Sequence, residues 1–165
     1  MKPIQRARGL AYRRKLRTQV VKESQPLRLK AFQVAETMVG VTETGHNSGP
    51  TVNKIIFDGG GWETGLEWCG LFVSYCYRHA GYTKTTWKWM RVFSYLGFSG
   101  VKRTSNPLKG NLVRFKFGHI GIFDRWISST EFSTIEGNTE GSDGSQGVRR
   151  RTRNKRDVLD FLEVR

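Results

Sequence analysis

A cysteine at the start of an apolar helix is the residue of this sequence best placed to act as a nucleophile. From Phe72 the apolar side chains recur at helical spacing as far as Ala80, and Gly81 is a typical helix stop. This pattern places Cys69 in the first turn, where unpaired backbone N–H groups and the positive end of the helix dipole favour a thiolate. A lone cysteine is more often a buried and inert apolar residue, so the assignment needs a base and an orienting group elsewhere in the chain.

The second cysteine, Cys76, lies on the same predicted helix. At a rise of about 1.5 Å per residue, the Cα atoms of Cys69 and Cys76 are expected about 10 Å apart, beyond the roughly 7 Å that a disulfide can bridge. Both are therefore predicted to be free thiols. Two cysteines at this separation and scattered histidines do not show the spacing of zinc ligands, so no metal site is expected.

Three histidines are candidates for the base. His79 is predicted on the helix of Cys69, about 15 Å along its axis, and a histidine in a last helical turn is explained by capping and the helix dipole. His46 lies in a polar loop. His119 opens a predicted strand beside glycines that leave room around its ring, so it is the histidine best able to meet a helix amino terminus.

A base also needs an orienting partner. Glu136 and Asn138 lie two residues apart near the end of another predicted strand, so both can point to the same face of a sheet. From the residues alone, a Cys–His–acid triad and a purely structural role for Cys69 both remain open.

The elements that must position these residues change character halfway along the chain. Helical periodicity predicts helices over residues 27–38, 52–57, 69–80 and 86–96. Alternating apolar residues then predict a hairpin over 113–123 and strands over 132–136, 147–151 and 158–164. Helices followed by strands indicate an α+β domain in which amino-terminal helices pack on an antiparallel β-sheet.

Charge is concentrated at both ends of the chain. The 165 residues carry a net charge of +14, with ten Lys or Arg against one Glu in residues 1–30 and six against none in residues 149–156. Such ends attract polyanions, whether nucleic acid, anionic lipid headgroups or phosphate-rich wall polymers, unless they serve only as a solvated surface. The sequence shows no apolar run long enough to span a membrane and no Sec-type export signal.

Four ordered blocks of this sequence resemble the CHAP family, the cysteine, histidine-dependent amidohydrolases and peptidases. They are Trp68-Cys69-Gly70-Leu71-Phe72-Val73-Ser74-Tyr75-Cys76, Gly110-Asn111-Leu112-Val113-Arg114-Phe115, Gly118-His119-Ile120-Gly121-Ile122 and Ile135-Glu136-Gly137-Asn138-Thr139. The resemblance covers about residues 30–153. One departure is Asn111, which stands where the family usually has Asp; a local effect on stability is expected from it rather than a different reaction.

The resemblance implies a papain-like α+β fold and hydrolysis of an amide bond in bacterial peptidoglycan. By position, it makes Cys69 the nucleophile, His119 the base and then the acid, Glu136 the residue that orients the imidazole, and Asn138 a supporting polar group. It implies no metal or other cofactor. The expected organisation is a basic amino-terminal segment over residues 1–25 and a CHAP catalytic domain over residues 26–165.

The activity expected from the resemblance is that of a phage endolysin or virion-associated lysin. It would be an N-acetylmuramoyl-L-alanine amidase or a peptide endopeptidase, made in the cytoplasm of a bacterial host and acting on the wall after release or from the virion. Expected partners are peptidoglycan, anionic wall polymers held by the basic ends, and other virion proteins. The alternatives are a cytosolic cysteine protease or deamidase, a nucleic-acid-binding protein, and a structural phage protein with a vestigial CHAP fold.

Overall fold

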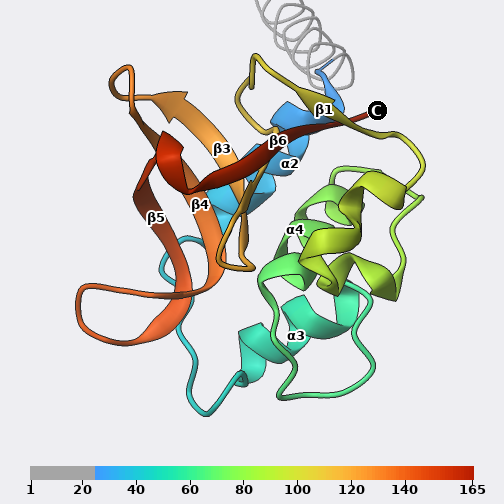
Figure 1. The fold of residues 1–165 in the computed structure, drawn as a ribbon. Helices are drawn as coiled ribbons and strands as arrows, with labels where there is room; N and C mark the ends of the chain where they lie inside the picture. Colours follow the sequence, from blue (N-terminus) through green and yellow to red (C-terminus); the bar gives the residue numbers. More distant parts are fainter. Residues whose placement is uncertain (1–24) are drawn as a thin grey trace, which may run out of the picture.

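The structure is a computed structural model that describes residues 25–165. Helices precede strands along this part of the chain, as the sequence predicts (Figure 1). The α-helices are α2 (Leu27–Met38), α3 (Pro50–Asp58) and α4 (Cys69–His79), and the 3-10 helices are η1 (Trp87–Met90), η2 (Val92–Gly97) and η3 (Lys155–Asp157). The strands are β1 (Val101–Thr104), β2 (Leu112–Phe115), β3 (Ile120–Trp126), β4 (Glu131–Glu140), β5 (Gln146–Asn154) and β6 (Val158–Val164). The basic segment predicted over residues 1–25 lies almost wholly outside the described residues.

Prolines and glycines mark the ends of the first two helices. Pro26 directly precedes α2, and Gly40 adopts a φ of 98° just beyond its end, where residues with a Cβ are disfavoured. Pro50 is the first residue of α3. Proline suits this position because its φ is fixed near the helical value and because a backbone N–H there would have no acceptor within the helix. Helix α3 therefore begins two residues before the predicted helix over 52–57.

Helix α4 lies in the middle of the molecule, with α3 below it and the sheet to its left and above it in Figure 1. It begins at Cys69 as predicted, and its residues from Cys69 to Tyr77 are all buried because α2, α3, β3 and β4 pack around it. Both of its cysteines are free thiols, in agreement with the sequence. Burial on all sides makes α4 the fixed element against which the rest of the site is built.

The predicted helix over residues 86–96 is wrong, because the chain forms the two short 3-10 helices η1 and η2 instead. Arg91 lies between them with a φ of −84° and a ψ of 89°, which is outside the helical region. Trp89 and Tyr95 are buried, whereas Phe93, another apolar residue of the predicted helix, has 64% of its surface exposed. A 3-10 helix has three residues per turn, so it presents a different set of side chains to the core.

The strands form one six-stranded antiparallel sheet in the order β1-β6-β2-β3-β4-β5. The predicted hairpin is β2 and β3, and the three later strands predicted from the alternation are β4, β5 and β6. Strand β1 was not predicted, since it is short and carries a single buried apolar residue, Val101. Only the three residues of η3 connect β5 to β6, although β2, β3 and β4 lie between them in the sheet. The sheet must therefore curl strongly.

The two faces of the curled sheet bury different sets of side chains. Leu112, Ile122 and Ile135 belong to the main core, which they share with α2 and α4. The other face, inside the curl, carries a smaller and mostly aromatic cluster of Val113, Phe115, Phe123, Phe132 and Phe161. Since successive residues of a strand point to opposite faces, Glu136 faces away from α4 whereas its neighbour Ile135 faces towards it.

Candidate active site

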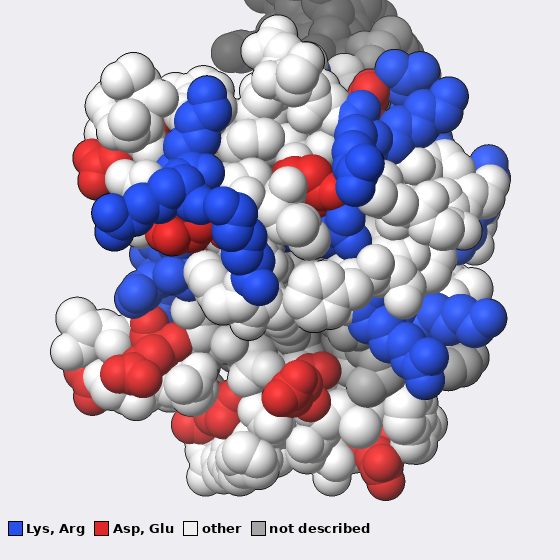
Figure 2. Space-filling model, in the orientation of Figure 1, with Lys and Arg blue, Asp and Glu red and all other residues white. Residues whose placement is uncertain are grey.

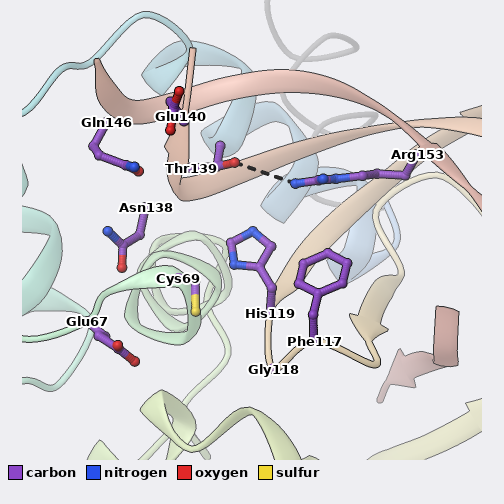
Figure 3. A pocket seen from close by; sticks show the side chains of 10 residues that line it. All are labelled: Glu67, Cys69, Phe117, Gly118, His119, Asn138, Thr139, Glu140, Gln146 and Arg153. Carbon is purple, nitrogen blue, oxygen red and sulfur yellow. Dashed lines mark hydrogen bonds between the residues drawn. The ribbon is translucent and has the colours of Figure 1, made fainter. Parts of the chain in front are cut away.

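A cleft of about 280 Å³ opens where the amino terminus of α4 meets the start of β3, the end of β4 and strand β5 (Figure 3). Cys69 lies at the first residue of α4, His119 directly precedes β3, and Asn138 lies on β4. The residues that line the cleft are Glu67, Cys69, Phe117, Gly118, His119, Asn138, Thr139, Glu140, Gln146 and Arg153. The fold thus brings together residues that lie far apart in the sequence.

The two cysteines of α4 have different surroundings. Cys69 has 7% of its surface exposed and lines the cleft, whereas Cys76 is fully buried within the main core. Burial raises the pKa of the Cys76 thiol well above its usual value, so this group stays protonated. The first intrahelical hydrogen bond is donated by the N–H of Phe72 to the carbonyl of Trp68, which leaves the N–H groups at the start of α4 available to a ligand.

The imidazole of His119 lies between Cys69 and the buried carboxylate of Glu136. Its Nε2 is 2.9 Å from Oε2 of Glu136, so Nδ1 is the nitrogen on the side of Cys69 (Figure 3). Burial disfavours the charged imidazole, but hydrogen bonds to Cys69 and Glu136 outweigh this effect and raise the pKa of His119 from 6.5 to about 9. The ring is therefore an imidazolium at neutral pH.

The other two histidines lie elsewhere. His79 is in the last turn of α4, where its Nε2 is 3.2 Å from Oδ2 of Asp58 and its ring packs on Tyr75. His46 lies in the loop before α3, where its ring contacts the side chain of Asn47. Among the histidines, only His119 lines the cleft with Cys69.

Glu136 is completely buried. Its carboxylate accepts hydrogen bonds from Nε2 of His119, from Oγ1 of Thr134 at 2.5 Å, and from Nε and Nη2 of Arg153 at 2.9 and 2.5 Å. Burial opposes ionisation, but the hydrogen bonds from Arg153 and His119 lower the pKa of Glu136 from 4.5 to about 2. The side chain of Glu136 packs closely against β3 because residue 121 of that strand is glycine. A Cβ at this position would lie 2.6 Å from Cγ of Glu136.

Asn138 bonds to the start of α4 rather than to His119. Its Oδ1 accepts a hydrogen bond from the backbone N–H of Trp68 at 3.0 Å, and its Nδ2 donates to Oδ1 of Asn47 at 2.9 Å and to Oε1 of Glu43 at 3.3 Å. Glu43 also accepts from the indole N–H of Trp68 at 2.9 Å. These bonds tie the residue before Cys69 to β4 and to the loop before α3, so they fix the start of α4.

Sequence reasoning did not single out three of these groups as site residues. Arg153 belongs to the basic run over residues 149–156, which was interpreted as a surface for polyanions. Thr134 lies two residues before Glu136, so the strand alternation that places both on one face could have indicated it. Glu43 belongs to the segment that precedes a polar loop, and nothing in its local pattern points to Trp68.

Asn111 lies outside the cleft. Its Oδ1 accepts a hydrogen bond from the backbone N–H of Leu108 at 2.7 Å, which closes the turn before β2. This contact is local to the turn and involves neither Cys69 nor His119.

Charge is unevenly distributed on the face of the molecule in Figure 2. Basic side chains gather over η3 and near the ends of β1 and β6, whereas acidic side chains lie mostly on the lower part of this face. Around η3 the exposed cations are Lys116, Lys155 and Arg156, and Nζ of Lys116 donates to the carbonyl of Arg156. Within residues 25–165 no cluster of His, Cys, Asp and Glu side chains is suited to hold a metal ion. No helix in this part of the chain is long and apolar enough to cross a lipid bilayer.

Comparison of the chain with protein-family models found no matching family, and comparison with curated proteins found no match.

Proposed function

We propose that this chain is a cysteine hydrolase of the CHAP type, with a papain-like domain that cleaves an amide bond of bacterial peptidoglycan. The observation that carries the proposal is that Cys69 and His119 line one cleft and that the buried carboxylate of Glu136 bonds to His119, in the order that the resemblance implies. A thiol, an imidazole and a buried carboxylate in series are the components of nucleophilic catalysis of acyl transfer.

The reaction begins with a thiolate at Cys69 and an imidazolium at His119. The sulfur attacks the carbonyl carbon of the scissile amide, and the oxygen that gains negative charge is stabilised by the free N–H groups at the start of α4. His119 then donates its Nδ1 proton to the nitrogen of the amide, the C–N bond breaks, and the amine leaves. The acyl group remains on Cys69 as a thioester.

Hydrolysis of the thioester completes the cycle. Nδ1 of the neutral His119 accepts a proton from a water molecule, and the resulting hydroxide attacks the thioester carbonyl. The C–S bond breaks, the carboxylic acid product leaves, and the thiolate and imidazolium are restored. Glu136 remains ionised throughout and stabilises the imidazolium through Nε2.

The bond specificity is part of the same proposal. The enzyme acts either as an N-acetylmuramoyl-L-alanine amidase or as an endopeptidase within the stem or cross-bridge peptide, as a phage endolysin or a virion-associated lysin. Mass spectrometry of fragments released from purified peptidoglycan distinguishes these activities, because an amidase frees the amino terminus of L-alanine whereas an endopeptidase frees an amine inside the peptide.

The test uses a matched pair of cysteine variants on the same helix. Cys69→Ala is expected to abolish the release of fragments, whereas Cys76→Ala is expected to keep it, with some loss of stability from a small cavity in the core. Both proteins are first shown to be folded by circular dichroism. Equal loss of release in the two folded variants contradicts the proposal. Nucleic-acid binding that survives Cys69→Ala, in a wild-type protein that releases no fragments, would instead favour the nucleic-acid-binding alternative.

A further inference from the structure

Arg153 lines the cleft beside the proposed triad, yet the reaction described above does not use it. It comes from β5, opposite Phe132 of β4, and its guanidinium reaches along the sheet to Glu136. There it binds both carboxylate oxygens, through Nε to Oε1 and through Nη2 to Oε2. A guanidinium suits such two-point binding because its N–H groups form a planar fork that matches a carboxylate.

The carboxylate of Glu136 needs a second cation besides His119. Its side chain is fully buried, and an ionised carboxylate is costly in such a place unless it is paired and hydrogen-bonded. His119 is a positive partner only while it is protonated, and in the proposed reaction it gives up that proton once in every cycle. Arg153 keeps its charge throughout, so it can compensate Glu136 during the interval in which His119 is neutral.

Aromatic rings hold the guanidinium of Arg153 in place. Its Cζ lies 5.2 Å from the ring centre of Phe115 and 5.5 Å from that of Phe117, within the range of cation–π attraction. Only 18% of the side chain is exposed. The rings of Phe115 and Phe117 are themselves stacked, with their centres 5.1 Å apart. Arg153 is therefore fixed on the side of Glu136 that lies away from α4.

We propose that Arg153 is a positioning residue of this active site: it holds Glu136 ionised and oriented towards His119, and so maintains the imidazolium opposite the Cys69 thiolate. The proposal rests on the proposed function in that Cys69 and His119 are taken as the reacting pair. Burial raises the pKa of Glu136, and hydrogen bonding from Arg153 is the largest of the effects that lower it. Removing Arg153 should therefore raise this pKa, and Glu136 should become neutral at a higher pH.

The experiment measures alkylation of Cys69 by iodoacetamide as a function of pH, in a Cys76→Ser background so that one thiol can react. Iodoacetamide reports the thiolate directly and requires no wall substrate. In Arg153→Met the acidic limb of the profile is expected to move to higher pH, since a neutral Glu136 no longer stabilises the imidazolium. A displacement by about one pH unit lowers the rate on that limb about tenfold, with little change on the alkaline side.

Two lysine substitutions separate this role from stability alone. Arg153→Lys keeps the positive charge but loses the planar two-point binding of the guanidinium. The acidic limb of its alkylation profile is therefore expected to move in the same direction by a smaller amount. The matched control is Arg114→Lys: Arg114 is 3% exposed and binds both oxygens of Asp160 at 2.7 and 2.6 Å, outside the cleft. This control is expected to lose stability and to keep the wild-type limb.

The outcomes are distinct. A wild-type acidic limb in folded Arg153→Met, or an equal displacement in Arg114→Lys, overturns the proposal. If Arg153→Met does not fold, Arg153→Lys decides, and an unmoved limb in that variant overturns it too. Absence of wall hydrolysis by the wild-type protein would reject the proposed function, whereas the role of Arg153 would still be decided by the alkylation profiles.

Discussion

His119 is the histidine that the fold brings to Cys69, whereas His79 is paired with Asp58 at the other end of α4. His119→Ala is expected to lower kcat/KM for peptidoglycan by about 10²–10⁴-fold, because the proton carrier is lost. Glu136→Gln should cost less, since it disturbs orientation and imidazolium stabilisation but leaves the imidazole. Turbidity clearing and fragment release measure both effects.

The control for this prediction is His79→Ala, which removes a histidine and its contact with Asp58 but leaves the cleft untouched. It should retain most of the activity. If His79→Ala inactivated a folded protein while His119→Ala did not, the assignment of the base would be wrong.

The ion pair of His119 and Glu136 also predicts how stability depends on pH. The pKa of His119 is raised to about 9, so its contribution is complete below its usual 6.5 and is lost as the pH rises through 9. The pKa of Glu136 is lowered to about 2, so its contribution is complete above its usual 4.5 and is lost as the pH falls towards 2. The pair should therefore contribute most between about pH 4.5 and 6.5.

Urea unfolding at a series of pH values tests this prediction. Asp160 also has a lowered pKa, because its hydrogen bonds to Arg114 and Arg103 outweigh its burial, so the acidic side reports more than one group. The alkaline side, between about pH 6.5 and 9, is the more specific range. Glu136→Gln should flatten the loss of stability there, and an unchanged slope in that variant would contradict the assignment.

The contact between α4 and β4 is what sets Cys69 against the end of the sheet. At Gly137 a Cβ would lie 2.6 Å from Phe72 and 2.8 Å from Trp68, so only glycine allows the strand to come this close. Gly137→Ala is expected to push α4 away from β4 and to destabilise the protein by about 1–3 kcal/mol. Since the same shift moves Cys69 relative to His119, activity should fall even under conditions where the protein stays folded.

Gly97→Ala is the matched control for this substitution, because a Cβ at Gly97 meets no atom within 4 Å. Thermal unfolding and fragment release should both remain near the wild-type values in this variant. A Gly137→Ala protein that behaved like Gly97→Ala would show that α4 does not depend on this close approach.

Across the whole molecule, the structure divides four of the six basic residues in the run over 149–156 into two groups. Arg150 pairs with Glu36 and Asp124, and Arg153 pairs with Glu136, so these charges serve internal ion pairs. Lys155 and Arg156 are exposed next to Lys116. Any attraction of this region to an anionic wall would therefore come from fewer charges than the sequence suggests.

This division gives a prediction about wall binding. Removing residues 1–23, or replacing Lys155 and Arg156 by glutamine, should weaken lysis of intact walls more than cleavage of a small soluble muropeptide. Neither Lys155 nor Arg156 lines the cleft. Exposed charges are screened beyond about 8 Å at physiological salt, so added salt should reproduce the effect on walls and leave the soluble substrate unaffected.

The control is Arg103→Gln, which removes an exposed arginine near the other edge of the sheet. It tests whether any loss of positive charge has the same effect. Full lysis of walls at low salt by the variants without the basic groups would assign those groups to another partner, such as nucleic acid, a membrane surface or a virion protein.

The sequence by itself determined the α+β class, the helix that begins at Cys69, and the hairpin that presents His119. These features follow from local periodicity and from residues such as Gly81 and Pro26, which act on their own part of the chain. The same reasoning failed over residues 86–96, where periodicity predicted one helix and the chain forms two 3-10 turns. It also missed β1, which pairs with β6 and has little pattern of its own.

The tertiary structure decided which side chains meet. Glu136 lies against His119 and Arg153 because β4 pairs with β3 on one side and β5 on the other, and Asn138 bonds to Trp68 because β4 approaches the start of α4. A basic residue in a basic run gives no local sign of a buried partner. These contacts join residues far apart in the chain, and only the register of the strands and the burial of a charged carboxylate determine them.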